Sequence, residues 1–280
     1  MTDLKDPDLY VGSMPYAELA ALRAAGSVHW NAESDGAGFW AVLGFDDIIT
    51  VSRQADLFSS AHENGGHRIF NENEVGLTGA GESAIGIPFI SRDPPTHTQY
   101  RKFVMPALSP ARLEGIEARI AERVERLFAD VPLNEAVNIL PLLTVPLPLL
   151  TLAELLGVSA DMWHDLHRWT DAFVGEDDPD FRQSPEAMQA VMGEFIGFAS
   201  ALFAERRANP GPDIASLLAK AGIHGPPVPL GDFIGNLILA LVGGNETTRN
   251  SINHSLIAFA NNPDQWDAIR SDPGLLPNAV

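Results

Sequence analysis

The fold of this chain is decided by the stretch Leu237-Ile238-Leu239-Ala240-Leu241-Val242-Gly243-Gly244-Asn245-Glu246-Thr247-Thr248-Arg249-Asn250. It starts as an apolar run and becomes polar at two glycines, and the apolar pattern resumes at Ile252 and Leu256. A helix that is apolar nearly all round is typical of a protein core. The spacing therefore predicts one long helix from Leu230 to Asn262, with a polar insert in its middle.

This polar insert costs stability unless the protein uses it. Each glycine in a helix interior costs roughly 1 kcal/mol relative to alanine, and buried polar groups add to that cost. Glycine lets a flat ligand approach the backbone, and a hydroxyl such as that of Thr247 can open the helical ladder. The alternative is that Gly243-Gly244 marks a helix end and that the polar run is a surface turn. The apolar spacing beyond the insert favours the continuous helix.

A second motif lies far upstream, at Asp93-Pro94-Pro95-Thr96-His97-Thr98-Gln99-Tyr100-Arg101. We expect Asp93 to be an N-cap and Pro94 the first helical residue, so that a helix begins near Pro95. His97 and Arg101 then lie at i and i+4 on one face, beside unpaired backbone N–H groups. Such a pair is suited to binding carboxylates. The alternative is an ordinary proline-started helix with a histidine and an arginine on its wet face.

Together, and in this order, the two motifs resemble the haem-binding and oxygen-activating segments of the cytochromes P450. The resemblance implies a haem b cofactor (iron protoporphyrin IX) whose propionates bind His97 and Arg101. It implies that Gly243, Gly244 and Thr248 line the cofactor. It also implies two catalytic residues, Thr247 as the hydroxyl beside the activated oxygen and Glu246 as the acid that relays protons.

The resemblance further implies a monooxygenase that uses O₂ and electrons from a ferredoxin and a ferredoxin reductase. The run Gly243 to Asn250 is most similar to that of bacterial enzymes that hydroxylate terpenes, fatty chains, alkanes or steroid side chains. An apolar small molecule is therefore the expected substrate. The alternative is a catalytically incompetent scaffold that binds an apolar ligand, or porphyrin without thiolate ligation.

Two hallmarks of this family are missing from the 280 residues. One is the cysteine that supplies the axial thiolate, since the chain contains no cysteine. The other is the Glu-x-x-Arg pair of a later helix. Glu246 and Arg249 spell that pair, but in the wrong helix, so we discount them. We therefore expect a chain truncated before the Glu-x-x-Arg helix and the cysteine loop, with no metal ligand of its own.

The expected fold is mainly α with a small β-sheet region, a cytochrome P450-like fold whose C-terminal part is absent. Residues 1–280 would form a single domain, running through the long central helix and into the next one. Proline and glycine punctuate its elements. Before the second motif we expect a helix (Tyr16 to Ala25) and a hairpin (Val28 to Asn31 and Gly38 to Leu43, with a turn at Ser34 to Ala37). Another helix (Phe45 to Arg53) and a long loop (His62 to Ser91) follow.

After the helix that begins near Pro95, the apolar spacing predicts longer helices. Ser109 is a plausible N-cap and Pro110 a plausible first helical residue. The expected ranges are Pro110 to Ala129, Pro141 to Gly157, Asp161 to Val174, Pro185 to Ala208, Asp213 to Gly222, Leu230 to Asn262 and Pro263 to Ser271. The tail from Asp272 to Val280 is expected to be a loop leading into another helix.

Composition narrows the functional classes. A formal net charge of −19 disfavours nucleic acid as a partner, because phosphate binding requires a concentrated cationic surface. The longest apolar runs are too short to span a bilayer. The chain resembles the soluble bacterial members of the family, which have no membrane anchor, and the absence of cysteine is compatible with the expected cytoplasmic location. Asp161, His164 and His167 have a spacing that could suggest a metal site, but these positions drift round a helix and no fourth ligand is evident. A partly exposed helical face is the preferred interpretation.

Overall fold

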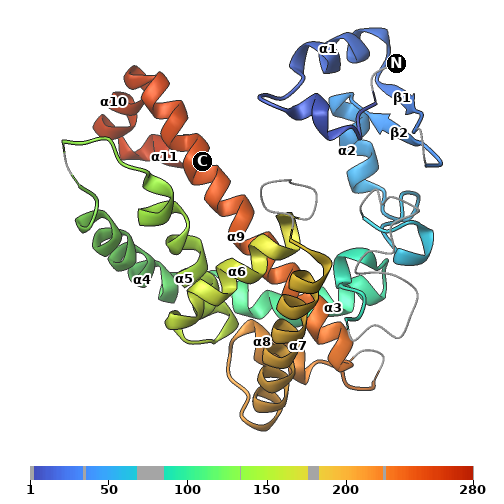
Figure 1. Cartoon of the computed structure of the whole chain (residues 1–280), viewed down its shortest axis with the longest axis vertical. Coiled ribbons are helices and arrows are strands. Elements are labelled where there is room, and N and C mark those ends of the chain that lie inside the picture. Colours follow the sequence, from blue (N-terminus) through green and yellow to red (C-terminus); the bar gives the residue numbers. More distant parts are fainter. Residues whose placement is uncertain are drawn as a thin grey trace. The chain divides into compact units, whose positions relative to one another are not determined.

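The structure is a computed structural model that describes residues 3–33, 36–67, 85–132, 134–175, 183–222 and 225–279. The chain divides into two compact units, which are described separately. The first unit comprises Met1–Ser83 and Phe89–Thr98, and the second comprises Ala84–Pro88 and Gln99–Val280. Figure 1 colours both along the sequence.

The first unit is built on a hairpin and two helices. The strands β1 (Val28–Asn31) and β2 (Phe39–Val42) pair antiparallel, and Trp30 faces Trp40 across the ladder. Their rings meet edge to face with centroids 5.2 Å apart, a favoured aromatic arrangement. The helices α1 (Tyr16–Ala25) and α2 (Phe45–Arg53) match their predicted bounds, and a 3₁₀ turn, η1 (Pro7–Tyr10), precedes them. The predicted turn at Ser34 to Ala37 lies partly outside the described residues, since 34 and 35 are not described.

The long loop predicted from His62 to Ser91 contains two short 3₁₀ turns, η2 (His62–Asn64) and η3 (Phe89–Ser91). Residues 68–84 of that prediction lie outside the described residues. The helix that follows, α3 (Thr96–Val104), begins later than predicted. The bonds given for the Asp93 carboxylate come from outside this helix, from Ser59 Oγ at 2.5 Å and Ser60 N at 3.1 Å. A long-range contact therefore binds the Asp93 carboxylate, which local spacing had assigned to the helix start.

The second unit is helical throughout its described residues. After η4 (Met105–Leu108) its elements are α4 (Pro110–Ala129), a π-turn η5 (Leu140–Thr144), α5 (Pro146–Leu156), η6 (Ala160–Met162), α6 (Trp163–Val174), α7 (Pro185–Ala208), α8 (Ile214–Lys220), α9 (Leu230–Asn261), α10 (Pro263–Ser271), η8 (Pro273–Leu275) and α11 (Leu276–Ala279). Most bounds agree with prediction within a few residues. The first turn predicted for the Pro141 helix is π-helical rather than α-helical, and the predicted tail loop is a 3₁₀ turn followed by the start of a helix.

One capping prediction is only half right. Ser109 has the extended backbone of an N-cap, and Pro110 is the first residue of α4. The Ser109 hydroxyl donates to the carbonyl oxygen of Pro106 at 3.0 Å instead of capping the helix. Sequence spacing thus located the start of α4, whereas the preceding 3₁₀ turn decided where the hydroxyl points.

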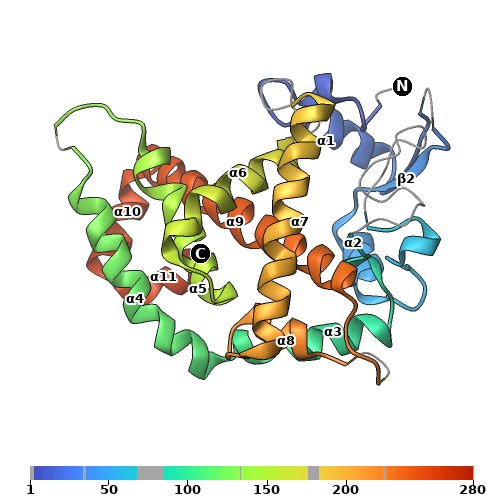
Figure 2. The ribbon, with the colours of Figure 1, turned by 60° about the horizontal axis from the view of Figure 1, so that its bottom comes forward.

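The core of the second unit lies where α9 meets α5, α6 and α7. Figure 2 shows α7 crossing α9, with α5 between α9 and α4. Aromatic side chains join α6 to α7: Phe195 lies edge to face with Trp169 at 5.3 Å and with Phe173 at 5.1 Å between ring centroids. On α9 the residues from Phe233 to Leu237 and Leu241 are buried, as predicted for a core helix. Further along α9, Leu256 and Ile257 are exposed.

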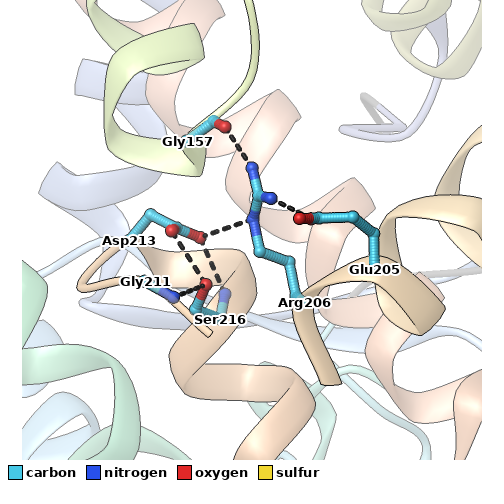
Figure 3. Close-up of polar contacts among 6 residues, drawn as sticks. All are labelled: Gly157, Glu205, Arg206, Gly211, Asp213 and Ser216. Atoms are coloured by element: carbon cyan, nitrogen blue, oxygen red, sulfur yellow. Dashed lines mark hydrogen bonds and ion pairs between the residues drawn. The ribbon is translucent and has the colours of Figure 1, made fainter. Parts of the chain in front are cut away.

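An ion-pair cluster fastens the ends of three helices in this unit (Figure 3). The guanidinium of Arg206, on α7, contacts Glu205, the carbonyl oxygen of Gly157 after α5, and Asp213 before α8. Asp213 also caps α8, because it accepts bonds from the backbone N–H and the hydroxyl of Ser216, each at 2.8 Å. Gly157 has φ +74°, and a Cβ there would collide with Asp213, so glycine is required on both counts.

The helix α7 is long and apolar enough to cross a membrane by length and composition alone, which the sequence analysis did not predict. A packing helix of a soluble protein passes the same test. Here α7 buries Phe195, Ala199 and Leu202. Those side chains pack within the second unit, so the apolar character of α7 already has a structural explanation.

Candidate functional site

The polar insert lies inside an unbroken helix. The α-helical backbone of α9 continues from Leu230 to Asn261, which excludes the alternative of a helix end at Gly243-Gly244. The hydroxyl of Thr247 donates to the carbonyl oxygen of Gly243 at 2.6 Å, one turn back. The helical ladder stays closed around this bond, contrary to the expectation that the hydroxyl opens it. Thr247 therefore adds a bond to the ladder without breaking the helix.

The two glycines of the insert have different surroundings. A Cβ built on Gly243 would have no atom within 4 Å, and Gly243 is exposed together with Thr247 and Thr248. A Cβ on Gly244 would instead lie 3.1 Å from Cδ1 of Leu152, on α5. Gly243 thus leaves open space beside Thr247, whereas Gly244 lets α9 approach α5. The sequence had grouped both glycines, with Thr248, as cofactor-binding residues.

The carboxylate of Glu246 is held by a neighbouring charge. It forms an ion pair with Arg249, which lies one turn along α9. Arg249 also faces Asp171 of α6, with Nη1 and Oδ1 4.0 Å apart, and Asp171 Oδ2 lies 2.7 Å from Nδ1 of His167. The hydrogen bond that the His167 imidazole donates to Asp171 is the main cause that raises the pKa of His167 above its usual value of about 6.5, while partial burial opposes it.

Sequence reasoning did not mention Asp171 and gave no role to Arg249 or to His167, which it named only within a metal spacing that it set aside. The Glu-x-x-Arg spelling of Glu246 and Arg249 was noticed and set aside as a family hallmark. It was nevertheless a signal, because residues at i and i+3 of a helix can form an ion pair. The contact between Arg249 and α6 is tertiary, and no local pattern could have predicted it.

Asn245 is a further residue that the sequence did not single out. It is completely buried, at 0% relative exposure, and neither atom of its side-chain amide has a hydrogen-bond partner among the described residues. An unpaired buried polar group costs about 1–3 kcal/mol. The cost lies directly between Gly244 and Glu246, in the part of α9 where a role in binding or chemistry was predicted.

On α3, His97 and Arg101 lie at i and i+4, as predicted from their spacing. The ring of His97 is half-buried against Phe89, with centroids 5.8 Å apart. Arg101 is exposed, and in the described part of the chain no carboxylate lies within ion-pair distance of its guanidinium. Arg101 is therefore available to an acidic ligand, and the alternative of a wet helix face has the same geometry.

The start of α9 is fixed by a close backbone contact. The N–H of Gly86 donates to the carbonyl oxygen of Gly231 at 2.8 Å. A Cβ on Gly235 would collide with the carbonyl oxygen of Gly86, so the two backbones touch directly. The hydroxyl of Tyr100, on α3, donates to Asp232 at the same end of α9. These contacts anchor the helix that carries the polar insert.

The metal reading of Asp161, His164 and His167 is not supported. Across the described ranges, no group of three or more histidine or acidic side chains is arranged to hold a metal ion. His164 stacks on Trp163 with ring centroids 3.6 Å apart, and His167 pairs with Asp171. Both imidazoles therefore have contacts other than metal.

Known proteins with similar sequences and structures identify the family. No family model matches the chain. The chain is 65% identical over 278 residues to linalool 8-monooxygenase of Pseudomonas putida, a match that covers 99% of the chain and 68% of that protein. A solved cytochrome P450 of Mycobacterium marinum, in complex with pseudoionone, superposes with a TM-score of 0.83 at 28% identity, over 97% of this chain and 68% of that one. The chain belongs to the cytochrome P450 family.

A more distant cytochrome P450 relative is the steroid C26-monooxygenase of Rhodococcus jostii, which is 32% identical over 96% of the chain. This match covers 57% of that protein, so the chain spans between about half and two thirds of the length of these relatives. The mainly helical fold with a small two-stranded sheet, expected from the sequence, is confirmed as part of a cytochrome P450 fold. These relatives are bacterial, and the two with curated names are monooxygenases.

Members of this family carry a haem, and residues of this chain fit such a group in part. Gly243 leaves open space beside the Thr247 hydroxyl on the exposed side of α9. Arg101 is a cation without a carboxylate partner among the described residues, which suits the acidic groups of a haem. The 280 residues contain no cysteine, so the thiolate that ligates the iron in this family is not supplied by this stretch of chain.

Proposed function

We propose that residues 1–280 are the N-terminal portion of a single-domain cytochrome P450 that hydroxylates an apolar small molecule. The observation that carries the proposal is the geometry around Gly243. A helix turn with open space at Gly243 presents the Thr247 hydroxyl, and the adjacent Glu246 is held by Arg249. Monooxygenation requires O₂ and two electrons, which we assign to a ferredoxin and its reductase.

The cofactor in this proposal is haem b, which supplies the oxidising chemistry when it is bound. The protein orients the substrate, supplies protons and excludes water. His97 and Arg101 would hold its carboxylates, and Gly243, Gly244 and Thr248 would border it. The hydroxyl of Thr247 would bond the oxygen substrate, and the carboxylate of Glu246 would take up and release protons from solvent. Gly244 contributes to this arrangement through packing, since it allows α9 to lie close to Leu152.

Among apolar substrates we favour terpene-type alcohols and ketones over steroids, alkanes and fatty chains. The 65% identical relative is named for linalool, and a solved relative of similar fold is in complex with pseudoionone. A panel with linalool, pseudoionone, a steroid and a fatty acid would be titrated into the full-length haem protein. The terpenoids should shift the haem absorption band at the lowest concentrations. A steroid or a fatty acid binding more tightly than both terpenoids would contradict this choice.

The role of Thr247 is tested in the full-length protein by Thr247→Ala. Substrate binding should stay nearly intact, because it depends on the shape of the pocket. Product formed per electron should fall, and hydrogen peroxide should rise, because the hydroxyl acts only after oxygen binds. Ser251→Ala is the matched control, since Ser251 also donates to the carbonyl one turn back, at 2.8 Å, and is also exposed. Equal coupling in both variants would remove Thr247 from the mechanism.

The competing reading is a scaffold that binds an apolar ligand, or porphyrin without thiolate, and catalyses nothing. The absence of cysteine in the 280 residues favours it for this stretch of chain alone. The 280-residue chain, reduced and exposed to carbon monoxide, should give no thiolate-type band, whereas the full-length protein should give one. A full-length protein without that band would favour the scaffold. We place the enzyme in the cytoplasm as a soluble protein, which recovery of the full-length form without detergent would test.

A further inference from the structure

An open groove of about 710 Å³ lies on the surface of the second unit, along α6. Polar side chains from one side of α6 line it, among them His164, His167 and Asp171. His167 and Asp171 are also the residues that lead inward to α9. The groove therefore connects solvent to one end of a series of charged side chains whose other end is Glu246.

This series, which we call the α6–α9 charge series, consists of His167, Asp171, Arg249 and Glu246. Nδ1 of His167 lies 2.7 Å from Oδ2 of Asp171, and the other carboxylate oxygen of Asp171 lies 4.0 Å from Arg249. Arg249 in turn forms an ion pair with Glu246. All four side chains are between 17% and 28% exposed, so water screens them less than it screens a surface pair.

Two basic side chains therefore share one carboxylate. Asp171 is approached by His167 from its own helix and by Arg249 from α9, and these are the charges that act on the imidazole. Other charges nearby are engaged elsewhere. Arg168, which also lines the groove, binds Asp165 at 3.1 Å and Glu194 of α7. On α5, Glu154 is bound by Arg119 and Arg123 of α4.

Arg249 also has two acidic partners, one on each side. When His167 is protonated, it neutralises part of the charge on Asp171, and Arg249 is then held mainly by Glu246. When His167 is neutral, the full charge of Asp171 attracts Arg249 away from Glu246, because opposite charges a few ångströms apart interact strongly at a half-buried site. The protonation of His167 thus sets how firmly the Glu246 carboxylate is held.

We propose that His167 and Asp171 are positioning residues for Glu246 and that they act through Arg249. Protons from the groove at His167 would tighten the grip of Arg249 on Glu246, and their loss would free the carboxylate to exchange protons. The inference rests on the proposed function, in which Glu246 relays protons. It adds that the relay is governed from α6.

The first experiment tests the charge series by measuring the titration of His167, without turnover. Imidazole signals of the full-length, haem-loaded protein would be titrated by NMR, and the His167 signal would be identified by its loss in His167→Gln. Asp171→Asn should shift the His167 titration to lower pH, because the hydrogen bond that favours the imidazolium is weakened. Arg249→Gln should shift it to higher pH, because a neighbouring positive charge is removed. An unchanged midpoint in both variants would overturn the charge series.

The second experiment measures turnover against pH, with linalool as the probe substrate. In wild type, turnover should rise as pH passes the midpoint of His167, and this inflection should disappear in His167→Gln. His164→Gln is the matched control, since His164 lines the same groove but stacks on Trp163, and it should keep the inflection. Affinity for substrate should be equal in all three proteins, which separates positioning from misfolding.

Failure of the inference and failure of the proposed function give different results. If Glu246→Gln slows turnover severalfold but His167→Gln keeps the wild-type inflection, the inference is wrong and the role of Glu246 stands. If Glu246→Gln turns over at the wild-type rate, the relay itself is wrong. Loss of the inflection in both histidine variants would indicate a general effect of the groove and would also overturn the assignment to His167.

Discussion

Gly244 of α9 and Leu152 of α5 are so close that a Cβ on the glycine would lie 3.1 Å from Cδ1 of the leucine. Leu152 is itself buried, at 4% exposure, and has little room to move. Gly243, the adjacent residue, has open space at the corresponding position. The two glycines, indistinguishable in sequence, therefore serve different purposes.

This difference predicts opposite effects of alanine. Gly243→Ala should raise the free energy of unfolding by about 0.5–1 kcal/mol, because alanine is the better helix former and meets no obstacle. Gly244→Ala should show no gain or a loss, because the new methyl group forces Leu152 to shift. Chemical denaturation of the 280-residue chain measures both. Equal stabilisation would mean that Leu152 adapts freely.

The buried amide of Asn245 predicts an unusual tolerance. Asn245→Leu should leave the free energy of unfolding unchanged or raise it by about 1 kcal/mol, because it removes polar atoms that have no partner among the described residues. Asn236→Leu is the matched control on the same helix. Asn236 is equally buried, at 1%, but donates to the carbonyl oxygen of Asp232 at 2.7 Å, so it should be destabilising. Equal losses at both sites, by thermal unfolding, would show that Asn245 is bonded.

From the pairing of His167 with Asp171 we predict that the stability of the folded protein depends on pH. Its pKa is raised in the folded protein, chiefly by Asp171, so folding is favoured when the imidazole is protonated. The contribution should be complete below the unfolded pKa of about 6.5 and should be lost as pH rises through the higher folded value. The difference in melting temperature between wild type and His167→Gln, measured from pH 5 to pH 9, should therefore shrink with rising pH. A difference that grows with pH would reverse the sign and refute the pairing.

The cluster in Figure 3 predicts a large effect at Asp213. Asp213→Ala removes the cap of α8 and leaves the Arg206 guanidinium without one of its acidic partners, which should cost about 3–5 kcal/mol. Asp272→Ala, at the exposed cap of η8 where Asp272 accepts from Gly274 N at 3.0 Å, should cost only about 0.5–1 kcal/mol. Urea denaturation compares the two, and similar losses would reduce Asp213 to an ordinary cap.

The pair on α3 predicts an effect on cofactor retention. In the full-length protein, replacing both His97 and Arg101 by alanine should lower haem occupancy after purification, since each charge-assisted hydrogen bond is worth roughly 1.5–3 kcal/mol. Lys102→Ala, which removes an exposed cation from the same helix, should leave occupancy unchanged. Equal occupancy in all three proteins would return the pair to a wet helix face.

Much of the fold could be predicted because its signals are local. The bounds of α1, α2 and α7 follow from apolar spacing and from proline or glycine at their ends, and the structure reproduces them. The position of the polar insert within α9 was predictable for the same reason. The assignments of Thr247, Glu246, His97 and Arg101 to catalysis or to haem remain predictions.

The rest could not be predicted because it depends on contacts between distant segments. Asp93 looked like a helix cap, yet Ser59 and Ser60 bind its carboxylate from more than thirty residues upstream. The packing of Gly244 depends on the position of Leu152. The link from Arg249 to Asp171 requires α6 and α9 to pack together, and nothing in either segment alone encodes that proximity.

The bond from Thr247 to the Gly243 carbonyl has a consequence for any molecule that reaches the exposed side of α9. A hydroxyl carries a single proton, and here the backbone has already claimed it. The oxygen lone pairs of the hydroxyl face outward, so an approaching group can form a hydrogen bond with Thr247 only if that group is a donor. Thr247 therefore acts first as a hydrogen-bond acceptor, and it can donate to a ligand only after its bond to the Gly243 carbonyl breaks.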